Sequence, residues 1–294
     1  MPVTNISNDA FNGITSLTKA VIPNGVTTIG DRAFNNCSLT RIIIPDSVTD
    51  VGENAFLDCD SLEKTIYLGT VDSWAQINFN NKESNPIKHS KNLYVNYELL
   101  ENANITNAIT IKPFAFYCCY TLKTLTIGDS VEIIGNRSFA YCYSLTNVTI
   151  SNSVTILDEC AFYDCKVLTN VALGNSVTTI GTQAFNYCVS LTTINLPNSV
   201  TSIGDNAFYN CKALKKITIP SSVETIGKKA FEKCSSLTNI TFSDTESWYR
   251  VKDYDKWQNK DGGISVITTS SYDNATNFTT TYYNYYWYKL KESN

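Results

Sequence analysis

The sequence predicts a repeat solenoid with a parallel β-sheet, built from about ten coils of 23 residues. The pattern Ile-Gly-x-x-Ala-Phe-x-x-Cys opens at Ile203 and opens again at Ile226. Phenylalanine recurs at a nearly constant spacing, and short stretches of alternating apolar and polar residues lie between these patterns. A single coil cannot bury its own apolar face, so such repeats form a core only when they stack on one another.

Nine phenylalanines define the repeat. Their successive gaps are 23, 22, 60, 23, 23, 23, 23 and 23 residues; the gap of 22 reflects a one-residue deletion, and the gap of 60 contains 37 additional residues. This regularity predicts one structural unit per repeat. The nine are Phe11, Phe34, Phe56, Phe116, Phe139, Phe162, Phe185, Phe208 and Phe231.

Each coil begins with a strand, as residues 185–208 illustrate. Leu191, Ile194 and Leu196 are apolar and the residues between them are polar, which is typical of a strand with one buried face. Pro197 ends the strand, because proline has no N–H to donate to a sheet. Equivalent strands of stacked coils are expected to lie parallel, about 4.8 Å apart.

The second half of the coil turns the chain. Ile203 ends a short extended piece, and we expect Gly204 to adopt a positive φ. Ala207, Phe208 and Cys211 are spaced i, i+1 and i+4, which predicts a short helical turn with all three on its buried side. Bulky turns on one side and a thin strand on the other predict a stack that curves with its strands on the concave face.

Eight of the ten cysteines follow the same repeat. They occupy the third residue after the phenylalanine, where Ile14 stands in the first unit, so this column is expected to be an apolar core position. Disulfides between coils are disfavoured by the distance between equivalent side chains, and a chain with one histidine and no C-x-x-C pair does not suggest zinc. Cys118 and Cys160 lie off the column and are the two thiols for which reactivity is considered. The column is Cys37, Cys59, Cys119, Cys142, Cys165, Cys188, Cys211 and Cys234.

A serine precedes the valine of most coils. We expect its hydroxyl to hydrogen-bond to the backbone of its own or the neighbouring coil, where the strand ends. A simple preference for serine in turns is the alternative. The column is Ser47, Ser130, Ser153, Ser176, Ser199 and Ser222.

The unit L-x-x-I-x-I-P-x-S-V-x-x-I-G-x-x-A-F-x-x-C-x-S resembles the BspA-like, or treponemal-type, leucine-rich repeat over roughly residues 1–245. Ser and Val replace the Asn and the spacer of the commoner leucine-rich repeat. The resemblance implies a right-handed leucine-rich-repeat solenoid with a parallel concave β-sheet. It also implies a bacterial cell-surface or secreted protein, often linked to adhesion, and similar surface proteins of protists.

Two segments depart from the repeat. The insertion, about 70–97, is expected to form a hairpin or loop packed on one flank of the coils. The segment SDTESWYRV echoes GTVDSWAQI, so that Trp248 corresponds to Trp74. The sequence thus predicts a solenoid over 1–245 and an aromatic-rich C-terminal β cap over 246–294. Carbohydrate stacking on exposed rings is the alternative role for the aromatic residues of this end. They are Tyr282, Tyr283, Tyr285, Tyr286, Trp287 and Tyr288.

Composition and missing motifs exclude several classes of function. A net charge of −4, from 23 basic and 27 acidic residues, does not indicate a nucleic-acid partner, and no apolar run is long enough to insert into a membrane. The sequence carries no phosphate-binding or dinucleotide-binding motif, so we expect no cofactor, no metal and no enzymatic activity. The one histidine, His89, lies in the polar stretch KHSKN and is expected to be a solvated loop residue.

What remains as a candidate site is the concave face of the strands. The residues eight and ten positions after each phenylalanine, or their equivalents in the irregular coils, point to this face, with cationic and apolar residues at the N-terminal end and neutral Asn and Thr further on. A solvated face chosen for β propensity is the alternative. The candidates are Lys19, Val21, Arg41, Ile43, Lys64, Asn102, Thr124, Asn147, Asn170, Thr193, Asn195, Lys216 and Asn239.

These features predict a non-enzymatic binding protein that recognises a protein partner on its concave face, with adhesion at the cell surface or after secretion implied by the resemblance. The alternatives are an intracellular interaction scaffold in the cytoplasm and a glycan-binding protein that uses the aromatic C-terminal segment. The N-terminal segment has no basic region followed by an apolar core, so we expect no signal peptide in this chain. Upstream coils, an anchor and the oligomeric state stay open.

Overall fold

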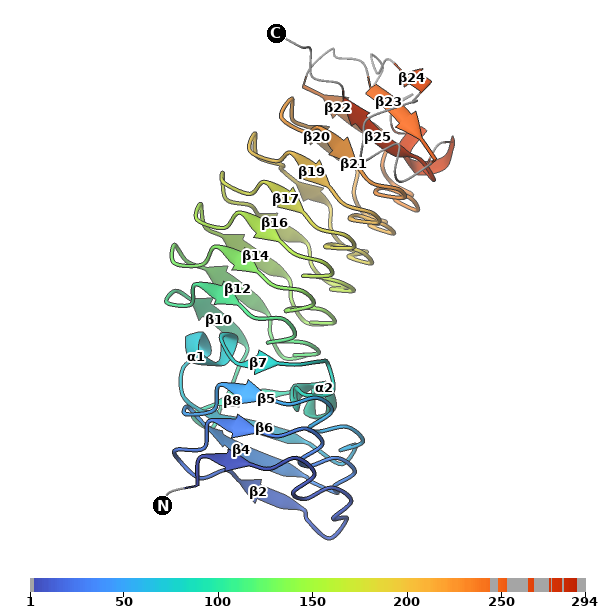
Figure 1. The fold of residues 1–294 in the computed structure, drawn as a ribbon. Helices are drawn as coiled ribbons and strands as arrows, with labels where there is room; N and C mark the ends of the chain where they lie inside the picture. Colours follow the sequence, from blue (N-terminus) through green and yellow to red (C-terminus); the bar gives the residue numbers. More distant parts are fainter. Residues whose placement is uncertain are drawn as a thin grey trace. The chain divides into compact units, whose positions relative to one another are not determined.

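The computed structural model describes residues 3–243, 248–252, 264–266, 275, 277–281 and 283–289. The chain divides into two compact units, residues 1–145 and 146–294. Both are parallel β-solenoids whose coils consist of a longer strand, a short strand and turns (Figure 1). This architecture, with about ten coils roughly 23 residues apart, confirms the predicted fold class.

In the first unit, the longer strands form one sheet that runs in the order β2, β4, β6, β8, β9 and a separate pair, β10 with β12. These strands are β2 (Lys19–Val21), β4 (Arg41–Pro45), β6 (Lys64–Leu68), β8 (Leu93–Val95), β9 (Glu98–Leu99), β10 (Asn102–Ile105) and β12 (Thr124–Ile127). The short strands are β1 (Asn5–Ile6), β3 (Thr28–Ile29), β5 (Asp50–Val51) and β7 (Asn78–Phe79) in one sheet, and β11 (Thr110–Ile111) with β13 (Ile133–Ile134).

In the second unit, equivalent strands pair in the same way, and a C-terminal segment adds antiparallel strands. The longer strands are β14 (Asn147–Ile150), β16 (Asn170–Ala172), β18 (Thr193–Ile194), β20 (Lys216–Ile219) and β22 (Asn239–Phe242). The short strands are β15 (Ile156–Leu157), β17 (Thr179–Ile180), β19 (Ser202–Ile203) and β21 (Thr225–Ile226). The added strands are β23 (Trp248–Val251), β24 (Ile264–Val266) and β25 (Tyr286–Lys289).

The phenylalanine and cysteine columns form the core, as the repeat predicts. Rings of successive coils stack at centroid distances of 5.1–5.5 Å with interplanar angles of 2–10°. All ten cysteines are buried and free. Six column thiols donate to the carbonyl of the phenylalanine in the preceding coil at 3.0–3.4 Å, which gives each buried sulfur a polar partner. They are Cys37, Cys59, Cys142, Cys188, Cys211 and Cys234.

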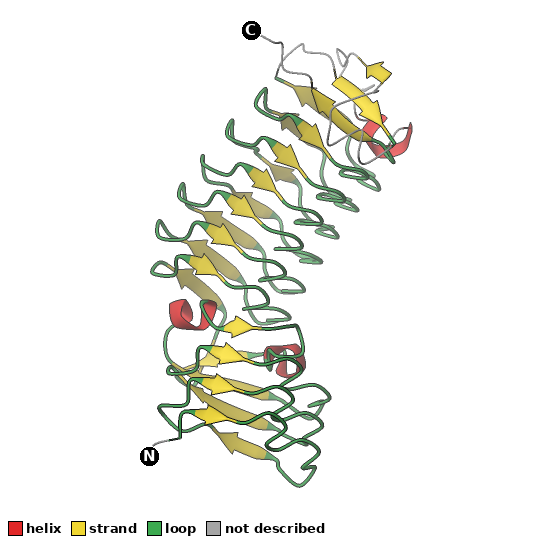
Figure 2. Ribbon diagram, viewed as in Figure 1, coloured by secondary structure: helices red, strands yellow, loops and turns green. Residues whose placement is uncertain are grey.

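The predicted helical turn after each glycine is wrong. Figure 2 shows strands and loops in the regular coils, and the turn residues bond to the next coil instead of forming a helix. The N–H groups of Asn206, Phe208 and Asn210 donate to carbonyls one coil further on at 2.8 Å each. Asn206 and Asn210 have positive φ values of 55° and 61°, which turn every second amide toward the neighbouring coil. Hydrogen bonds to the neighbouring coil therefore take the place of the helix that was predicted within one coil.

Gly204 does not have the predicted positive φ. It is required for another reason: a Cβ at this position would lie 2.5 Å from the backbone nitrogen of Thr182 and 2.7 Å from the carbonyl carbon of Gly181. Gly227 shows the same crowding, with a Cβ position 2.4 Å from the nitrogen of Asp205. The glycine column thus marks close approach of neighbouring backbones.

The serine column bonds between coils. The hydroxyls of Ser47, Ser199 and Ser222 donate to valine carbonyls of the preceding coil at 2.8, 2.6 and 2.7 Å. These contacts confirm the hydrogen-bonding interpretation at Ser47, Ser199 and Ser222, because the donors satisfy carbonyls at the strand ends.

The insertion is more than the predicted hairpin or loop. Its β7 pairs parallel with β5 and its β8 pairs parallel with β6, so it contributes an irregular coil of its own. Helices α1 (Val71–Ala75) and α2 (Ile87–Ser90) flank these strands, and only the β8–β9 turn is an antiparallel hairpin. Asp72 of α1 accepts hydrogen bonds from the N–H groups of Thr106 and Asn107 at 2.7 Å each, so α1 is hydrogen-bonded to the following coil.

At the C-terminal end, β25 lies antiparallel on β21, with Trp287 opposite Ile226. Phe278 of the π-helix η1 (Asn277–Thr281) packs on the last ring of the column, Phe231, at 6.0 Å, and on Trp287 at 4.2 Å. Tyr286, Trp287 and Tyr288 are at most 6% exposed, so these rings are not available for carbohydrate stacking. Tyr282 and several other residues of the predicted cap lie outside the described residues, and the division at 245 stays a prediction.

Trp74 and Trp248 share a local sequence but not a structure. Both are fully buried, yet Trp74 lies in α1 and Trp248 begins strand β23. The Nε1–H of Trp74 donates to the carbonyl of Ala115 at 2.7 Å. The predicted correspondence therefore holds for burial and not for the element that carries the side chain.

Candidate functional site

The strand face gathers cations in the first unit; it is defined as the surface that carries the residues eight and ten positions after each phenylalanine, or their equivalents in the irregular coils. Lys19, Arg41 and Lys64 are register partners on β2, β4 and β6, which lie side by side (Figure 1). Within the described residues, none of the three makes an ion pair. The structure therefore brings together the three cations that sequence spacing predicted, as one row, here called the basic row.

The apolar part of this face differs from the prediction. Val21 is 63% exposed, but Ile43 is 7% exposed and its register partner Ile66 is 4% exposed. The insertion explains part of this, because β8 extends the same sheet and places Tyr94 next to Ile66. Ile43 therefore belongs to the packed sheet and offers little apolar area to a partner.

Further along the chain, the candidate residues are neutral and already bonded to one another. Thr124 donates to Asn102 at 2.6 Å in the first unit, and the amide of Asn170 donates to Asn147 at 2.9 Å in the second. Such bonds use up part of the hydrogen-bonding capacity that a ligand needs. Lys216 and Asn239 are exposed register partners on β20 and β22.

One hollow lies on the strand face of the second unit. Its volume is about 350 Å³, and Asn170, Ala172, Thr193 and Asn195 are among its lining residues. The lining is uncharged, which contrasts with the basic row of the first unit. Of the predicted candidates in this unit, the structure thus brings Asn170, Thr193 and Asn195 together around one concavity.

The two cysteines outside the column are both buried. Cys118 is 6% exposed and Cys160 is 2% exposed. Burial raises the pKa of the Cys118 thiol to about 11, so the nucleophilic thiolate is rare at neutral pH. Nor do His, Cys, Asp and Glu side chains of the described ranges form a cluster of three suited to a metal ion.

His89 is not the solvated loop residue that the sequence predicts. Its side chain is 5% exposed, with Nδ1 3.3 Å from a carboxylate oxygen of Asp60 and Nε2 3.5 Å from Glu83, which also pairs with Lys88. Nε2 has no hydrogen-bond partner. Burial, followed by the charge of Lys88, lowers the pKa of His89 against the opposing effect of the two carboxylates. The sequence around His89 is polar and does not indicate this burial, because the groups that cover the side chain come from other segments.

The buried His89 predicts acid sensitivity. Because the pKa of His89 is lower in the folded chain, the unfolded chain binds the proton more tightly, and stability is lost as the pH falls below about 6.5. We expect the melting temperature to drop between pH 7 and pH 5, and His89→Asn to flatten that part of the profile. Because His89 is the one histidine of the chain, a difference between the pH profiles of the unaltered chain and His89→Asn can be attributed to it. Identical profiles of melting temperature against pH for the unaltered chain and His89→Asn would contradict this prediction.

A row of tyrosines on the turn side of the second unit was not predicted. Tyr163 and Tyr209 follow their phenylalanines by one residue, whereas Tyr187 follows by two, so the repeat does not align them. The rings are nevertheless neighbours, at 6.0 Å and 5.6 Å between centroids. An enrichment of tyrosine just after the phenylalanines was the signal that could have revealed this row.

Solved structures of bacterial leucine-rich-repeat proteins resemble this chain. A leucine-rich repeat protein from Bacteroides ovatus is 25% identical, with a TM-score of 0.51, covering 81% of this chain and 70% of its own. A leucine rich cell surface protein from Faecalibacterium prausnitzii is 26% identical, with a TM-score of 0.52, covering 89% of this chain and 67% of its own. No curated protein matches the chain in sequence.

The family model described as a BspA type leucine rich repeat region matches residues 4–110 and 155–254 in six copies. Proteins of such repeats typically act as protein-interaction modules, not as enzymes, because stacked coils present an extended binding surface. Among the described residues, no helix has the length and apolar character needed to cross a membrane. With its stacked Phe and Cys columns and this match over most of its length, the chain belongs to the family of BspA-type leucine-rich-repeat proteins.

Proposed function

We propose that this chain is a cell-surface adhesion module that binds an acidic segment of a protein partner on the basic row of its first unit. The observation that carries the proposal is the alignment of Lys19, Arg41 and Lys64 on adjacent strands, without an ion pair to any described residue. A row of cations that the chain does not neutralise is complementary to carboxylates on a partner.

The sheet beneath this row favours recognition. The strands are held in register by parallel pairing, and Ile43 and Ile66 are buried beside the row, so little backbone freedom is lost on binding. Lys64 is also positioned by the ring of Tyr94, whose centroid lies 5.5 Å from its Nζ. Val21, which is 63% exposed, adds apolar area at the edge of the row.

Two observations support a location at the cell surface. A structurally similar protein from Faecalibacterium prausnitzii, 26% identical, is a leucine rich cell surface protein. The ten free thiols are compatible with this location, because each is at most 6% exposed and therefore shielded from oxidants.

The test is charge reversal on the basic row. Binding of Lys19→Glu/Lys64→Glu to a panel of purified matrix and serum proteins is measured by surface plasmon resonance at low and high ionic strength. We expect about a tenfold loss of affinity, mainly in the association rate, and weaker binding of the unaltered chain at high salt. Arg41 is left in place, since its Nε is buried without a hydrogen-bond partner.

Lys82→Glu is the matched control, because Lys82 is exposed in the same unit outside the strand face. Both variants are expected to keep the free energy of unfolding within about 0.5 kcal/mol, as is usual for surface residues. Equal affinities of Lys19→Glu/Lys64→Glu and Lys82→Glu would show that the basic row does not contribute to binding.

A further inference from the structure

The tyrosine row of the second unit, Tyr163, Tyr187 and Tyr209, is a surface feature separate from the strand face. Neighbouring rings are inclined by 53° and 52°, so the three do not stack flat on one another as the buried phenylalanines do. Tyr187 is 37% exposed, and Tyr163 and Tyr209 are half-buried. Each of the three residues is therefore partly open to solvent.

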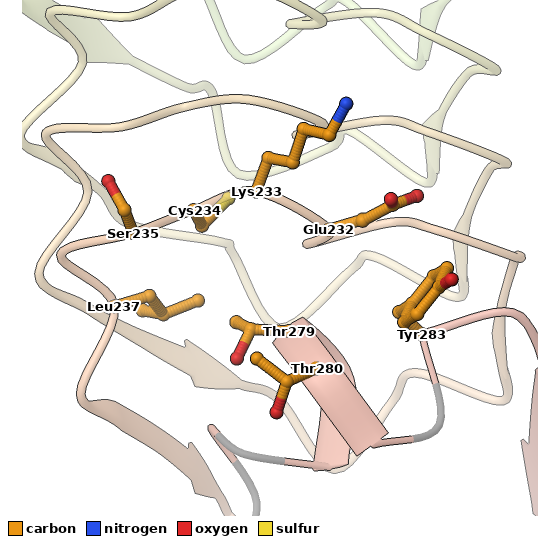
Figure 3. Close-up of a pocket in the computed structure, with 8 residues that line it drawn as sticks. All are labelled: Glu232, Lys233, Cys234, Ser235, Leu237, Thr279, Thr280 and Tyr283. Carbon is orange, nitrogen blue, oxygen red and sulfur yellow. The ribbon is translucent and has the colours of Figure 1, made fainter.

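Lys233 joins the row to a cavity. Its Nζ lies 5.0 Å from the ring centroid of Tyr209, and Lys233 is also one of the residues that line a cavity of about 460 Å³. Figure 3 shows the coil segment 232–235 on one side of this cavity and η1, with Thr279 and Thr280, on the other. The cavity is therefore the continuation of the tyrosine row at its C-terminal end.

The lining has a distinct chemical character. Ser235, Thr279 and Thr280 bring hydroxyls, Tyr283 brings a phenol and a ring, and Leu237 brings an apolar surface. Glu232 and Lys233 also line the cavity, but the ammonium of Lys233 points away from it, toward the ring of Tyr209 (Figure 3). One carboxylate oxygen of Glu232, Oε2, is buried without a hydrogen-bond partner and lies 3.7 Å from the Nζ of Lys229.

We propose that the tyrosine row and this cavity form a binding site for a neutral oligosaccharide chain. The C–H faces of pyranose rings stack on aromatic side chains, while their hydroxyls bond to the hydroxyls and carboxylate of such a lining. A series of rings along three coils matches a linear chain of sugar units better than a single sugar. The site lies on the turn side of the second unit and does not depend on the basic row of the first unit.

The charges of the site favour a neutral ligand. Lys233 is engaged with the ring of Tyr209, and Glu232 lies 3.7 Å from the ammonium of Lys229. The carboxylate is thus paired with one ammonium and the other ammonium is held over a ring, so neither is presented alone to an anionic or a cationic chain. A proline-rich peptide also docks on aromatic rings, but the many hydroxyls of the cavity favour a ligand rich in hydroxyls itself.

The probes are N-acetylchitohexaose, cellohexaose, maltohexaose and mannohexaose, titrated calorimetrically into the full chain. We expect one or more of them to bind, Tyr187→Ala to weaken that binding about tenfold, and Tyr187→Phe to retain most of it. Ser235→Trp, which fills the cavity from an exposed position, is expected to shorten the longest chain bound. Tyr97→Ala is the control, because Tyr97 is 61% exposed in the first unit.

Absence of binding to all four hexasaccharides, or equal binding by Tyr187→Ala and the unaltered chain, overturns the proposal. Binding of a proline-rich decapeptide that is lost in Tyr187→Ala, without saccharide binding, reassigns the surface to peptides and also overturns it. Lys19→Glu/Lys64→Glu is expected to bind saccharide normally, so failure of this site is distinguishable from failure of the proposed protein-binding function.

Discussion

Replacing Phe185 by alanine is expected to lower the free energy of unfolding by about 3–5 kcal/mol, the usual cost of deleting a buried aromatic ring. The ring is fully buried and stacks on Phe162 and Phe208 at 5.5 Å each, so its loss leaves a cavity in two interfaces at once. In a stack of coils, each coil is stabilised by its two neighbours. We therefore expect the second unit to lose cooperativity as well as stability.

Urea unfolding together with amide hydrogen exchange measures this effect. Protection is expected to fall across coils 162–231, and more weakly in the first unit. Phe11→Ala is the matched control: Phe11 is 39% exposed and has one stacked neighbour, Phe34, so its loss should cost much less. Equal costs at the two positions would show that stacking along the column contributes little to stability.

The second large effect is expected from Gly204→Ala, at about 3 kcal/mol, the upper part of the range for overpacking. The new Cβ would lie 2.5 Å from the nitrogen of Thr182, which is backbone and cannot rotate away. The coils must separate locally, and this strains the bond from Gly204 N–H to the carbonyl of Ile180, now 2.8 Å long. Since φ at Gly204 is not positive, backbone strain of the alanine itself is not the cause.

Gly128→Ala provides the comparison. A Cβ there would first meet the methyl carbon Cγ2 of Thr106 at 3.1 Å, which is a side-chain atom and needs to give by only a few tenths of an ångström. Thermal melts of the two variants should therefore differ clearly, with Gly204→Ala melting lower. A milder effect at Gly204 than at Gly128 would mean that the coils are not packed as closely as this structure shows.

The periodic residues were the predictable part of the protein. Phe185 and Cys188 recur in nearly every coil, and a side chain that recurs at a fixed period can pack on its own copy whatever the detailed turn geometry. The role of Gly204 was predicted for the wrong reason. Both a positive φ and a close backbone contact select glycine, and the residue type does not distinguish the two.

The non-periodic residues could not be placed in this way. The contacts of His89 with Asp60 and Glu83 depend on an insertion whose strands pair with earlier coils, and a polar local sequence does not reveal such pairing. The basic row was predictable, because Lys19, Arg41 and Lys64 share one column. The burial of Ile43 was not, because it depends on the sheet that surrounds it.

Repetition in the amino-acid sequence was thus enough to establish a stack of coils, its buried columns and the residues that share its strand face, because each of these repeats a local interaction at a constant interval. Folding in three dimensions was needed to establish the extra coil of the insertion, the burial of His89 and the meeting of Tyr163, Tyr187 and Tyr209 in one row. These features join residues at irregular separations, so their contacts depend on the path of the backbone and not on the period.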